Sequence, residues 1–196
     1  MTMLTIWSET EPTEPVLRTS DPLRIGDELA AVGITFDRLE VRDDVDASSS
    51  QEQVLDSYAA LIERLCASQG YTLVDVAQLH LTPESPEELL ETATAARARF
   101  LNEHTHDEEE IRFFAHGSGV FYLHIGERVL AMLCTKGDLL SVPALTTHWF
   151  DMGTLPDFTA IRFFRSDDGW VGSFTGSDIA SRFPTFDELT QAPSNA

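Results

Sequence analysis

The sequence predicts a mainly β protein with flanking α-helices, in which an antiparallel sandwich or barrel follows a helical N-terminal part. From residue 103 onward, short runs rich in β-branched and aromatic residues recur about every ten residues between Gly-containing or charged turns. Before that point, apolar residues recur at helical steps of three and four. We therefore expect one domain over 1–196, with a helical elaboration over about 1–102, a barrel core over about 103–185 and a frayed tail over 186–196.

The first elements alternate between strand and helix patterns. Residues 4–7 fit a short edge strand, and the Pro- and Glu-rich residues after them fit a surface turn. Asp21 and Pro22 are suitable N-cap and N1 residues for a helix that ends near Gly33. Residues 34–41 follow as a strand candidate.

Two further helices are predicted before the β-rich part. One spans about 51–68 and ends at Gly70. The other has the pattern of a capping box, with Ser85 as N-cap and Glu88 at N3, and it should run to about Phe100. Residues 71–81 between them are mostly apolar without a clean period, so their type stays open.

The β-rich part contains six candidate strands. They are residues 111–115, 120–125, 129–134, 139–142, 147–151 and 158–164. Closing such strands into a barrel would remove exposed edges, and we expect that closure. A last capped turn is predicted at Thr185, with Glu188 at N3.

The charge of the chain limits its partners. The formal net charge is −20, from 33 acidic and 13 basic residues. Nucleic acids and anionic membrane surfaces bind clustered Lys and Arg, so neither is an expected partner. No apolar run reaches the roughly 20 residues of a membrane span, and no signal-peptide pattern begins the chain, so we expect a cytoplasmic monomer. Cys66 and Cys134 lie in apolar surroundings and are expected to be buried, inert thiols.

A cluster of possible metal ligands begins the β-rich part. If this stretch is extended, His104, His106, Glu110 and Arg112 share one face, because alternate residues of a strand point the same way. Two imidazoles and a carboxylate suit a divalent metal ion. A fourth ligand is expected from His148, on a later strand. Arg112 would act on substrate charge, and the alternative is a surface ion pair with Glu108 or Glu110.

These motifs resemble those of known families. His104-x-His106-x3-Glu110-x6-Gly117 and Gly137-x5-Pro143-x4-His148 resemble the two cupin motifs, except that Ala98 and Leu145 stand where glycines are usual. More narrowly, the chain from about 80 to 185 resembles the acireductone dioxygenases of methionine salvage. The stretches that carry this resemblance are Glu103 to Phe114, Phe121 to Ile125, Lys136 to Pro143, His148 to Gly153, Ala160 to Phe164 and Gly169 to Val171.

The resemblance implies a cupin-type double-stranded β-barrel, or jelly roll, and a reaction. The substrate would be the acireductone 1,2-dihydroxy-3-keto-5-methylthiopentene, cleaved with O2 at one Fe2+ or Ni2+ ion per chain. The Fe2+ form would yield 4-methylthio-2-oxobutanoate and formate, and the Ni2+ form 3-methylthiopropanoate, formate and CO. The sequence does not choose between the two metals.

The resemblance also implies weaker assignments for five residues. Phe100, Phe150 and Trp170 match aromatic positions near the family's substrate pocket, with ordinary core packing as the alternative. Glu103 matches a position proposed to aid metal incorporation and Glu109 one proposed to relay conformational change, with a solvated acidic face as the alternative.

The remaining histidines have plainer interpretations. His124 is expected to pack within a strand, with a role behind the metal site as the alternative, and His116 is expected to be exposed beside a Gly turn. His80 stays unassigned. Two other functions remain open: a non-catalytic cupin that binds a metal or small ligand, and a different cupin metalloenzyme.

Overall fold

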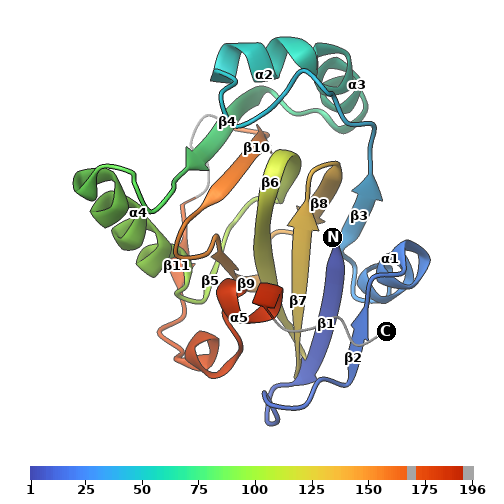
Figure 1. Cartoon of the computed structure of the whole chain (residues 1–196). Helices are drawn as coiled ribbons and strands as arrows, with labels where there is room; N and C mark the ends of the chain where they lie inside the picture. The colour runs from blue at the N-terminus through green and yellow to red at the C-terminus, as the bar shows by residue number, and fades with distance from the viewer. Residues whose placement is uncertain (167–170, 192–196) are drawn as a thin grey trace.

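The structure is a computed structural model of the chain, and it describes residues 1–166 and 171–191. Eleven strands form one antiparallel sheet, with helices on its outside (Figure 1). The strands are β1 (Met3–Ser8), β2 (Leu17–Thr19), β3 (Thr35–Arg38), β4 (Leu73–His80), β5 (His104–Thr105), β6 (Glu110–Ile125), β7 (Arg128–Thr135), β8 (Asp138–Val142), β9 (Thr147–Asp151), β10 (Asp157–Phe164) and β11 (Ser173–Phe174). The helices are α1 (Pro22–Ala30), α2 (Gln51–Ser57), α3 (Ala59–Gln69), α4 (Glu87–Phe100), the 3₁₀ helix η1 (Ile179–Arg182) and α5 (Phe186–Gln191).

The long strand β6 joins the two halves of the sheet. Its first half pairs with β8 and β10, and its second half pairs with β7 and β9. The partners change at Gly117, where φ is +67° and an added Cβ atom would lie 1.9 Å from the carbonyl oxygen of Asp157. Only glycine fits such a position. The two strands predicted at 111–115 and 120–125 are therefore one strand, with a bulge in place of the expected turn.

The predicted class, mainly β with flanking helices, is confirmed, but the expected closure of the sheet is not. Among the described strands, the main hydrogen-bonded path ends at β11 and β2 without joining. These two end strands are only 2 and 3 residues long. Short end strands leave little unpaired backbone at these two edges. Away from this path, β4 is eight residues long and pairs only with β10 among the described strands.

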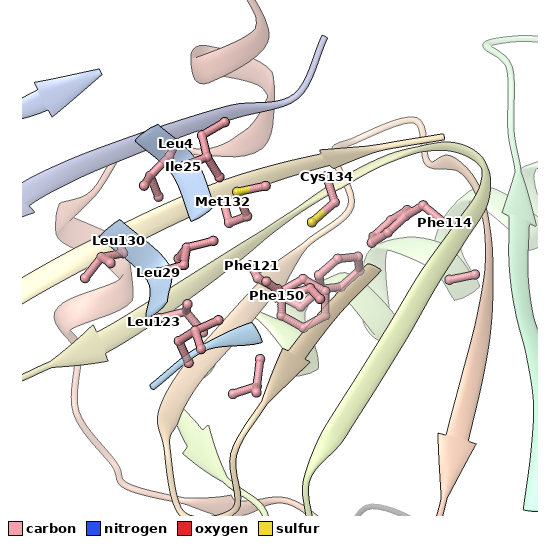
Figure 2. Close-up of a cluster of buried hydrophobic side chains, with 14 of the residues drawn as sticks. Leu4, Ile25, Leu29, Phe114, Phe121, Leu123, Leu130, Met132, Cys134 and Phe150 are labelled. Carbon is pink, nitrogen blue, oxygen red and sulfur yellow. The ribbon is translucent and has the colours of Figure 1, made fainter. Parts of the chain in front are cut away.

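Three clusters of apolar side chains hold the layers together. The first lies between the two halves of the sheet and includes Phe114, Phe121 and Phe150, which gather between strands in Figure 2. Helix α1 covers part of this cluster with Ile25 and Leu29. The second cluster lies under η1 and α5, and the third under α2 and α3. Both halves of the sheet therefore bury one face inward and much of the other face under helices.

The first 102 residues, for which we predicted a helical elaboration with strand candidates at 4–7 and 34–41, supply four strands of the sheet. Strand β1 was expected at an edge, but it pairs with both β7 and β2. Strand β4, whose type the sequence left open, pairs with β10 over eight residues. Strand β3 is shorter than the predicted run of 34–41. The N-terminal segment is thus part of the scaffold.

Two predicted helix boundaries are wrong, one because of a tertiary contact and one because of a local turn. The helix expected over 51–68 is divided into α2 and α3 at Tyr58, whose buried ring packs on Phe113 with 4.9 Å between centroids and whose hydroxyl accepts a hydrogen bond from the backbone of Arg42. Tertiary contacts therefore fix Tyr58 outside helical geometry. At α4 no capping box forms, because Pro86 is the N-cap and Ser85 accepts from the backbone of Thr82.

Other local predictions are confirmed. The Asp21 side chain caps α1 by accepting from the backbone of Leu23. Glu188 reaches back to the backbone of Thr185 at the start of α5. Both cysteines are free, and burial raises the pKa of both thiols, although Cys66 is only partly buried. Within the described part of the chain, no helix has both the length and the apolar character needed to cross a membrane.

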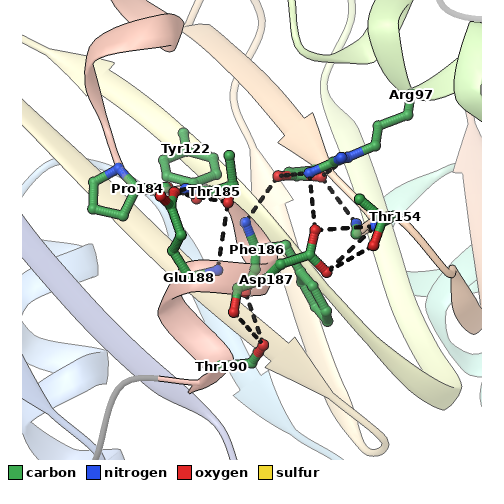
Figure 3. Close-up of polar contacts among 11 residues, drawn as sticks. Arg97, Tyr122, Thr154, Pro184, Thr185, Phe186, Asp187, Glu188 and Thr190 are labelled. Carbon is green, nitrogen blue, oxygen red and sulfur yellow. Dashed lines mark hydrogen bonds and ion pairs between the residues drawn. The ribbon is translucent and has the colours of Figure 1, made fainter.

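A buried carboxylate connects α4, β9 and α5, the elements beside the functional site described below. Asp151 is fully buried and accepts two hydrogen bonds from Arg97 of α4, at 2.6 and 2.9 Å, and one from the backbone of Phe186 at 2.8 Å. Asp187 adds a weaker contact to Arg97 at 3.3 Å (Figure 3). The ion pair between Asp151 and Arg97 therefore fixes α4 against β9.

We expect Asp151→Ala to lower the free energy of unfolding by about 3 kcal/mol, because it leaves a largely buried guanidinium without its main partner. Asp187→Asn is the matched control, and it should cost about 1 kcal/mol or less, because that carboxylate is partly exposed. Urea unfolding followed by circular dichroism measures both. Equal losses in the two variants would contradict the assignment of Asp151 as the main partner.

Candidate metal centre

Three buried histidines lie together beside β5 and β9. His104 of β5 pairs with His148 of β9 across the two strands, and His106 follows β5 directly. The possible ligand atoms of the three side chains all lie within 4.8 Å of one another, and each of the three residues is at most 7% exposed. Imidazole nitrogens are common ligands of Zn, Cu, Fe and Ni ions. This group can therefore hold a metal ion.

Backbone carbonyls fix the orientation of all three rings. Each histidine donates its Nδ1 hydrogen to a carbonyl oxygen, and the acceptors are Asn102 for His104 at 2.7 Å, Val171 for His106 at 3.2 Å and Thr146 for His148 at 2.8 Å. When Nδ1 carries the hydrogen of a neutral imidazole, Nε2 keeps a free lone pair for a metal. These carbonyls could not be predicted from side-chain patterns.

Glu110, the first residue of β6, faces two of these histidines. Its Oε2 atom lies 3.0 Å from Nε2 of His148 and 3.2 Å from Nε2 of His106. All three atoms are acceptors when the imidazoles are neutral, so such distances require a proton or a metal ion among them. Burial alone raises the pKa of Glu110, but the charge of Arg112 and the hydrogen bonds from the two histidines outweigh burial and hold this pKa well below its ordinary value. The carboxylate is thus in the form that binds metals.

Arg112 lies two residues further along β6 and is buried. Its Nε donates to Oε1 of Glu110 at 2.8 Å. Its guanidinium lies over the rings of Phe121 and Phe150, at 5.8 and 5.6 Å from their centroids. Burial lowers the pKa of Arg112 and Glu110 opposes this effect, and a guanidinium keeps its charge under such conditions. The ion pair with Glu110 that we considered as an alternative exists, but it is buried rather than on the surface.

A cavity of about 110 Å³ adjoins these residues. Besides the histidines, Glu110 and Arg112, its lining consists of Arg99, Phe100, Phe150, Arg162, Gly172 and Phe174. Phe100 and Phe150, predicted as pocket residues, are thus placed at the cavity, although Phe150 also packs in the core. Trp170 lies outside the described residues.

Four of the lining residues were not predicted from the sequence. Arg162 could have been found from strand alternation, because it lies two residues after the inward-facing Ala160. Arg99 and Phe174 come from a helix end and from a strand of two residues, where no periodic pattern exists. Gly172 approaches both His104 and His106 closely, and no local signal marks it.

The histidine stretch was predicted to be one extended strand, but it is not. His104 lies in β5, Glu110 begins β6, and residues 106–109 form an irregular connection between them. His104 meets His148 because β5 pairs with β9, whereas Glu110 begins the half of β6 that pairs with β8, the strand that precedes β9 in the chain. The predicted group is therefore brought together by sheet pairing rather than by the alternation of one strand.

Glu103 and Glu109, to which the resemblance assigned metal incorporation and conformational relay, do not form a solvated acidic face. Glu103 is 4% exposed and accepts hydrogen bonds from Nδ1 of His124 at 2.7 Å and from Thr175 at 2.6 Å. His124 also contacts Glu9 at 2.9 Å, so it bridges two carboxylates rather than only packing in its strand. Burial lowers the pKa of His124, but these two partners outweigh burial and raise it. His124 therefore connects the residue before His104 to the N-terminal segment.

Glu109 is held on the other side of the connection. It accepts hydrogen bonds from Ser141, from Arg165 at 3.1 Å and from the hydroxyl of Tyr71 at 3.4 Å. Burial, together with the charge of Glu109, raises the pKa of Tyr71 to about 12. These contacts place Glu109 between β8 and the segment before β4. Whether it relays conformational change remains a proposal.

One of the two departures from the cupin motifs leaves a strained residue. Leu145 replaces the usual glycine after Pro143, and its φ is +64°, in the left-handed region that favours glycine. Its backbone N–H donates to the carbonyl of His106 at 2.8 Å, which holds this loop against the metal centre. Ala98, the other departure, lies within α4, so no glycine turn is needed there.

We expect Leu145→Gly to raise the free energy of unfolding by about 0.5–1 kcal/mol. The change removes the strain of about 1–2 kcal/mol of a side chain in this conformation and is partly offset by the entropy that glycine adds to the unfolded chain. The leucine side chain is 67% exposed, so little burial is lost. The control is Ala144→Gly, which has no positive φ to relieve and should destabilise. Thermal unfolding of the two variants checks the opposite signs.

The chain is similar to known proteins in sequence and in structure. The model of the ARD/ARD' family matches residues 4–172. An acireductone dioxygenase of Frankia alni is 54% identical over 100% of this chain and 94% of its own length, and one of Saccharopolyspora erythraea is 54% identical over 96% and 98%. A solved acireductone dioxygenase from Bacillus anthracis, with a cadmium ion in its active centre, superposes with a TM-score of 0.73 at 21% identity, covering 89% of this chain and 98% of that one.

The structural likeness confirms the predicted cupin-type fold, apart from the closure of the sheet. The family match covers both histidine motifs, and the two relatives align along almost the whole chain. The chain therefore belongs to the ARD/ARD' family, that of the acireductone dioxygenases.

Proposed function

We propose that this chain is a metal-dependent dioxygenase that cleaves the acireductone 1,2-dihydroxy-3-keto-5-methylthiopentene with O2. The observation that carries the proposal is the convergence of three oriented histidines and the ionised Glu110 at a cavity that also contains Arg112. A protein that only binds a metal would need the metal ligands, but it would not need the buried guanidinium of Arg112 beside them.

We propose that His104, His106, Glu110 and His148 hold one Fe2+ or Ni2+ ion. Three imidazoles and a carboxylate suit both ions, and they give the loaded site a formal charge of about +1. When bound, the ion would supply positions at which the two neighbouring oxygens of the enediol can chelate, which favours their deprotonation.

The residues of the chain supply positive charge and an apolar wall to the cavity. Arg112 lies at the cavity wall, where its positive charge stabilises a deprotonated substrate. Arg99 also lines the cavity, as does Arg162, whose guanidinium is paired with Asp75 at 2.6 Å. Positive side chains at the cavity are what a chain of charge −20 needs in order to accept an anion. Phe100 and Phe150 form an apolar wall that suits the methylthio tail, and we assign Trp170 to the same pocket from its family position.

The test uses protein stripped of metal and reconstituted with Fe2+ or Ni2+ in separate samples. The substrate is added without air, O2 is admitted, and the decay of substrate absorbance is followed. We expect 4-methylthio-2-oxobutanoate and formate from the Fe2+ form, and 3-methylthiopropanoate, formate and CO from the Ni2+ form. Decay no faster than without protein would favour a binding protein, and O2-independent turnover of a sugar phosphate would favour a different cupin enzyme.

We also propose that the chain acts as a monomer, because its large negative charge opposes self-association. Light scattering at physiological salt measures the molar mass directly.

A further inference from the structure

A second group of metal-binding side chains lies away from the candidate metal centre. His80 ends β4, Asp157 begins β10, and His116 lies in β6 beside the bulge. Their possible ligand atoms all lie within 4.8 Å of one another. His116 was expected to be exposed, but its side chain is only 23% exposed, and that of His80 is 18% exposed. Neither residue takes part in the function proposed above.

The group lies on the face of the sheet opposite the cavity. Asp157 and Arg162 are five residues apart in the regularly paired strand β10, so their side chains point to opposite faces. Arg162 lines the cavity. Asp157 therefore faces the outside, where the carboxylate is 58% exposed and an ion could enter from solvent.

The fold brings the three side chains together through pairing and through one glycine. His80 and Asp157 are direct cross-strand partners. On the other side of β10, Gly117 lets the backbone of β6 approach the Asp157 carbonyl, which brings the neighbouring His116 beside the same carboxylate. Oδ1 of Asp157 lies 2.7 Å from Nδ1 of His80 and 3.3 Å from Nε2 of His116.

The surroundings favour a cation. Nε2 of His80 lies 3.0 Å from the hydroxyl of the fully buried Thr159, and a hydrogen bond from Nε2 to this hydroxyl would leave the Nδ1 lone pair facing Asp157. Asp46 adds nearby negative charge, since hydrogen bonds from Ser48 and, more weakly, the charge of His116 lower its pKa. A shared metal ion keeps such ligand atoms roughly 3 Å apart, because zinc bonds to nitrogen and oxygen measure about 2.0–2.2 Å.

We propose that His80, His116 and Asp157 form a second metal site, which binds a divalent transition ion of the zinc class and links β4, β10 and β6. Solvent completes the coordination, because the three side chains supply one ligand atom each. Binding displaces the protons of the two imidazoles from the positions that face Asp157, so the affinity falls at acidic pH. The ion stabilises the native chain by an amount that grows with the logarithm of its concentration above Kd.

The test is equilibrium dialysis of the full chain against micromolar Zn2+, with millimolar Mg2+ present to occupy exposed carboxylates. We expect two Zn2+ ions per wild-type chain and one in the double variant His80→Gln/His116→Gln. Asp157→Asn, at an exposed position, should weaken the second equivalent by more than about tenfold. His148→Ala should keep only this second equivalent. Zn2+ should raise the melting temperature of the wild type beyond the first equivalent and should not do so in the double variant.

His124→Gln is the matched control, because it removes an imidazole of similar exposure that also contacts two carboxylates. It should keep the second equivalent. One Zn2+ per wild-type chain that is lost in His148→Ala and kept in the double variant would overturn the proposal. A second equivalent that survives in both the double variant and Asp157→Asn would overturn it too, because that ion would be bound at unrelated surface carboxylates.

Discussion

His148→Ala is expected to lose most of its bound metal and all measurable dioxygenase turnover. His148 is 2% exposed, and its ring centroid lies 4.5 Å from that of His104. Its Nδ1 is fixed by the Thr146 carbonyl, so its Nε2 is directed at Glu110. Removing a ligand should weaken metal binding by more than about 100-fold, beyond the loss seen when only a residue behind a ligand is changed.

Metal analysis of His148→Ala measures how much metal remains at the candidate metal centre. The substrate-decay assay measures its turnover. His148→Gln is the second variant, because it keeps polar volume in the buried site and so separates ligand loss from misfolding. Thr147→Ala, the preceding residue of the same strand, should keep both metal and turnover. Removal of metal from the wild type by a chelator should lower its melting temperature, since binding is linked to folding. Normal metal content and activity in His148→Ala would remove His148 from the ligand set.

The strands from β6 to β10 were predictable because they are apolar and bounded by turn residues, whereas their partners were not. Nothing in the local pattern of residues 111–125 says that one strand serves both halves of the sheet. That outcome depends on Gly117 and on the carbonyl of Asp157, forty residues away in the chain. The buried Tyr58 and the cap of α4 are similar cases, in which a tertiary contact or a turn overrides a helical signal.

At the site, the side chains that carry chemistry were predictable and their supports were not. The spacing of His104, His106, Glu110 and His148 indicated a shared ion, and the structure brings these residues together. The orienting carbonyls and the Asp151–Arg97 pair involve backbone atoms or residues distant in sequence, which no motif spacing encodes. The structure also adds a second function to Arg112, because this residue holds one oxygen of Glu110 while the other oxygen faces the histidines.

Arg112→Ala is expected to keep the metal and to slow turnover by about 100-fold or more, the loss typical of removing one group that stabilises developing charge. The ligands all remain, so metal content should stay close to that of the wild type. The loss of stability caused by the substitution should depend on whether metal is bound. Without metal, the variant leaves Glu110 buried without its cation and should lose about 3 kcal/mol. With metal bound, the ion neutralises the same carboxylate, so the loss should be smaller.

The comparison of metal-free and metal-loaded unfolding therefore separates the two functions of Arg112. Arg112→Lys keeps the positive charge but lacks the planar guanidinium. It should therefore recover part of the turnover, and it should hold Glu110 in place less well than arginine does. Arg24→Gln, which removes an exposed ion pair on α1, is the matched control and should behave like the wild type in both assays. If Arg112→Ala turned over substrate at the wild-type rate, the guanidinium would not act on substrate charge. If it lost its metal, Arg112 would instead act chiefly by holding Glu110 in the position that completes the ligand set.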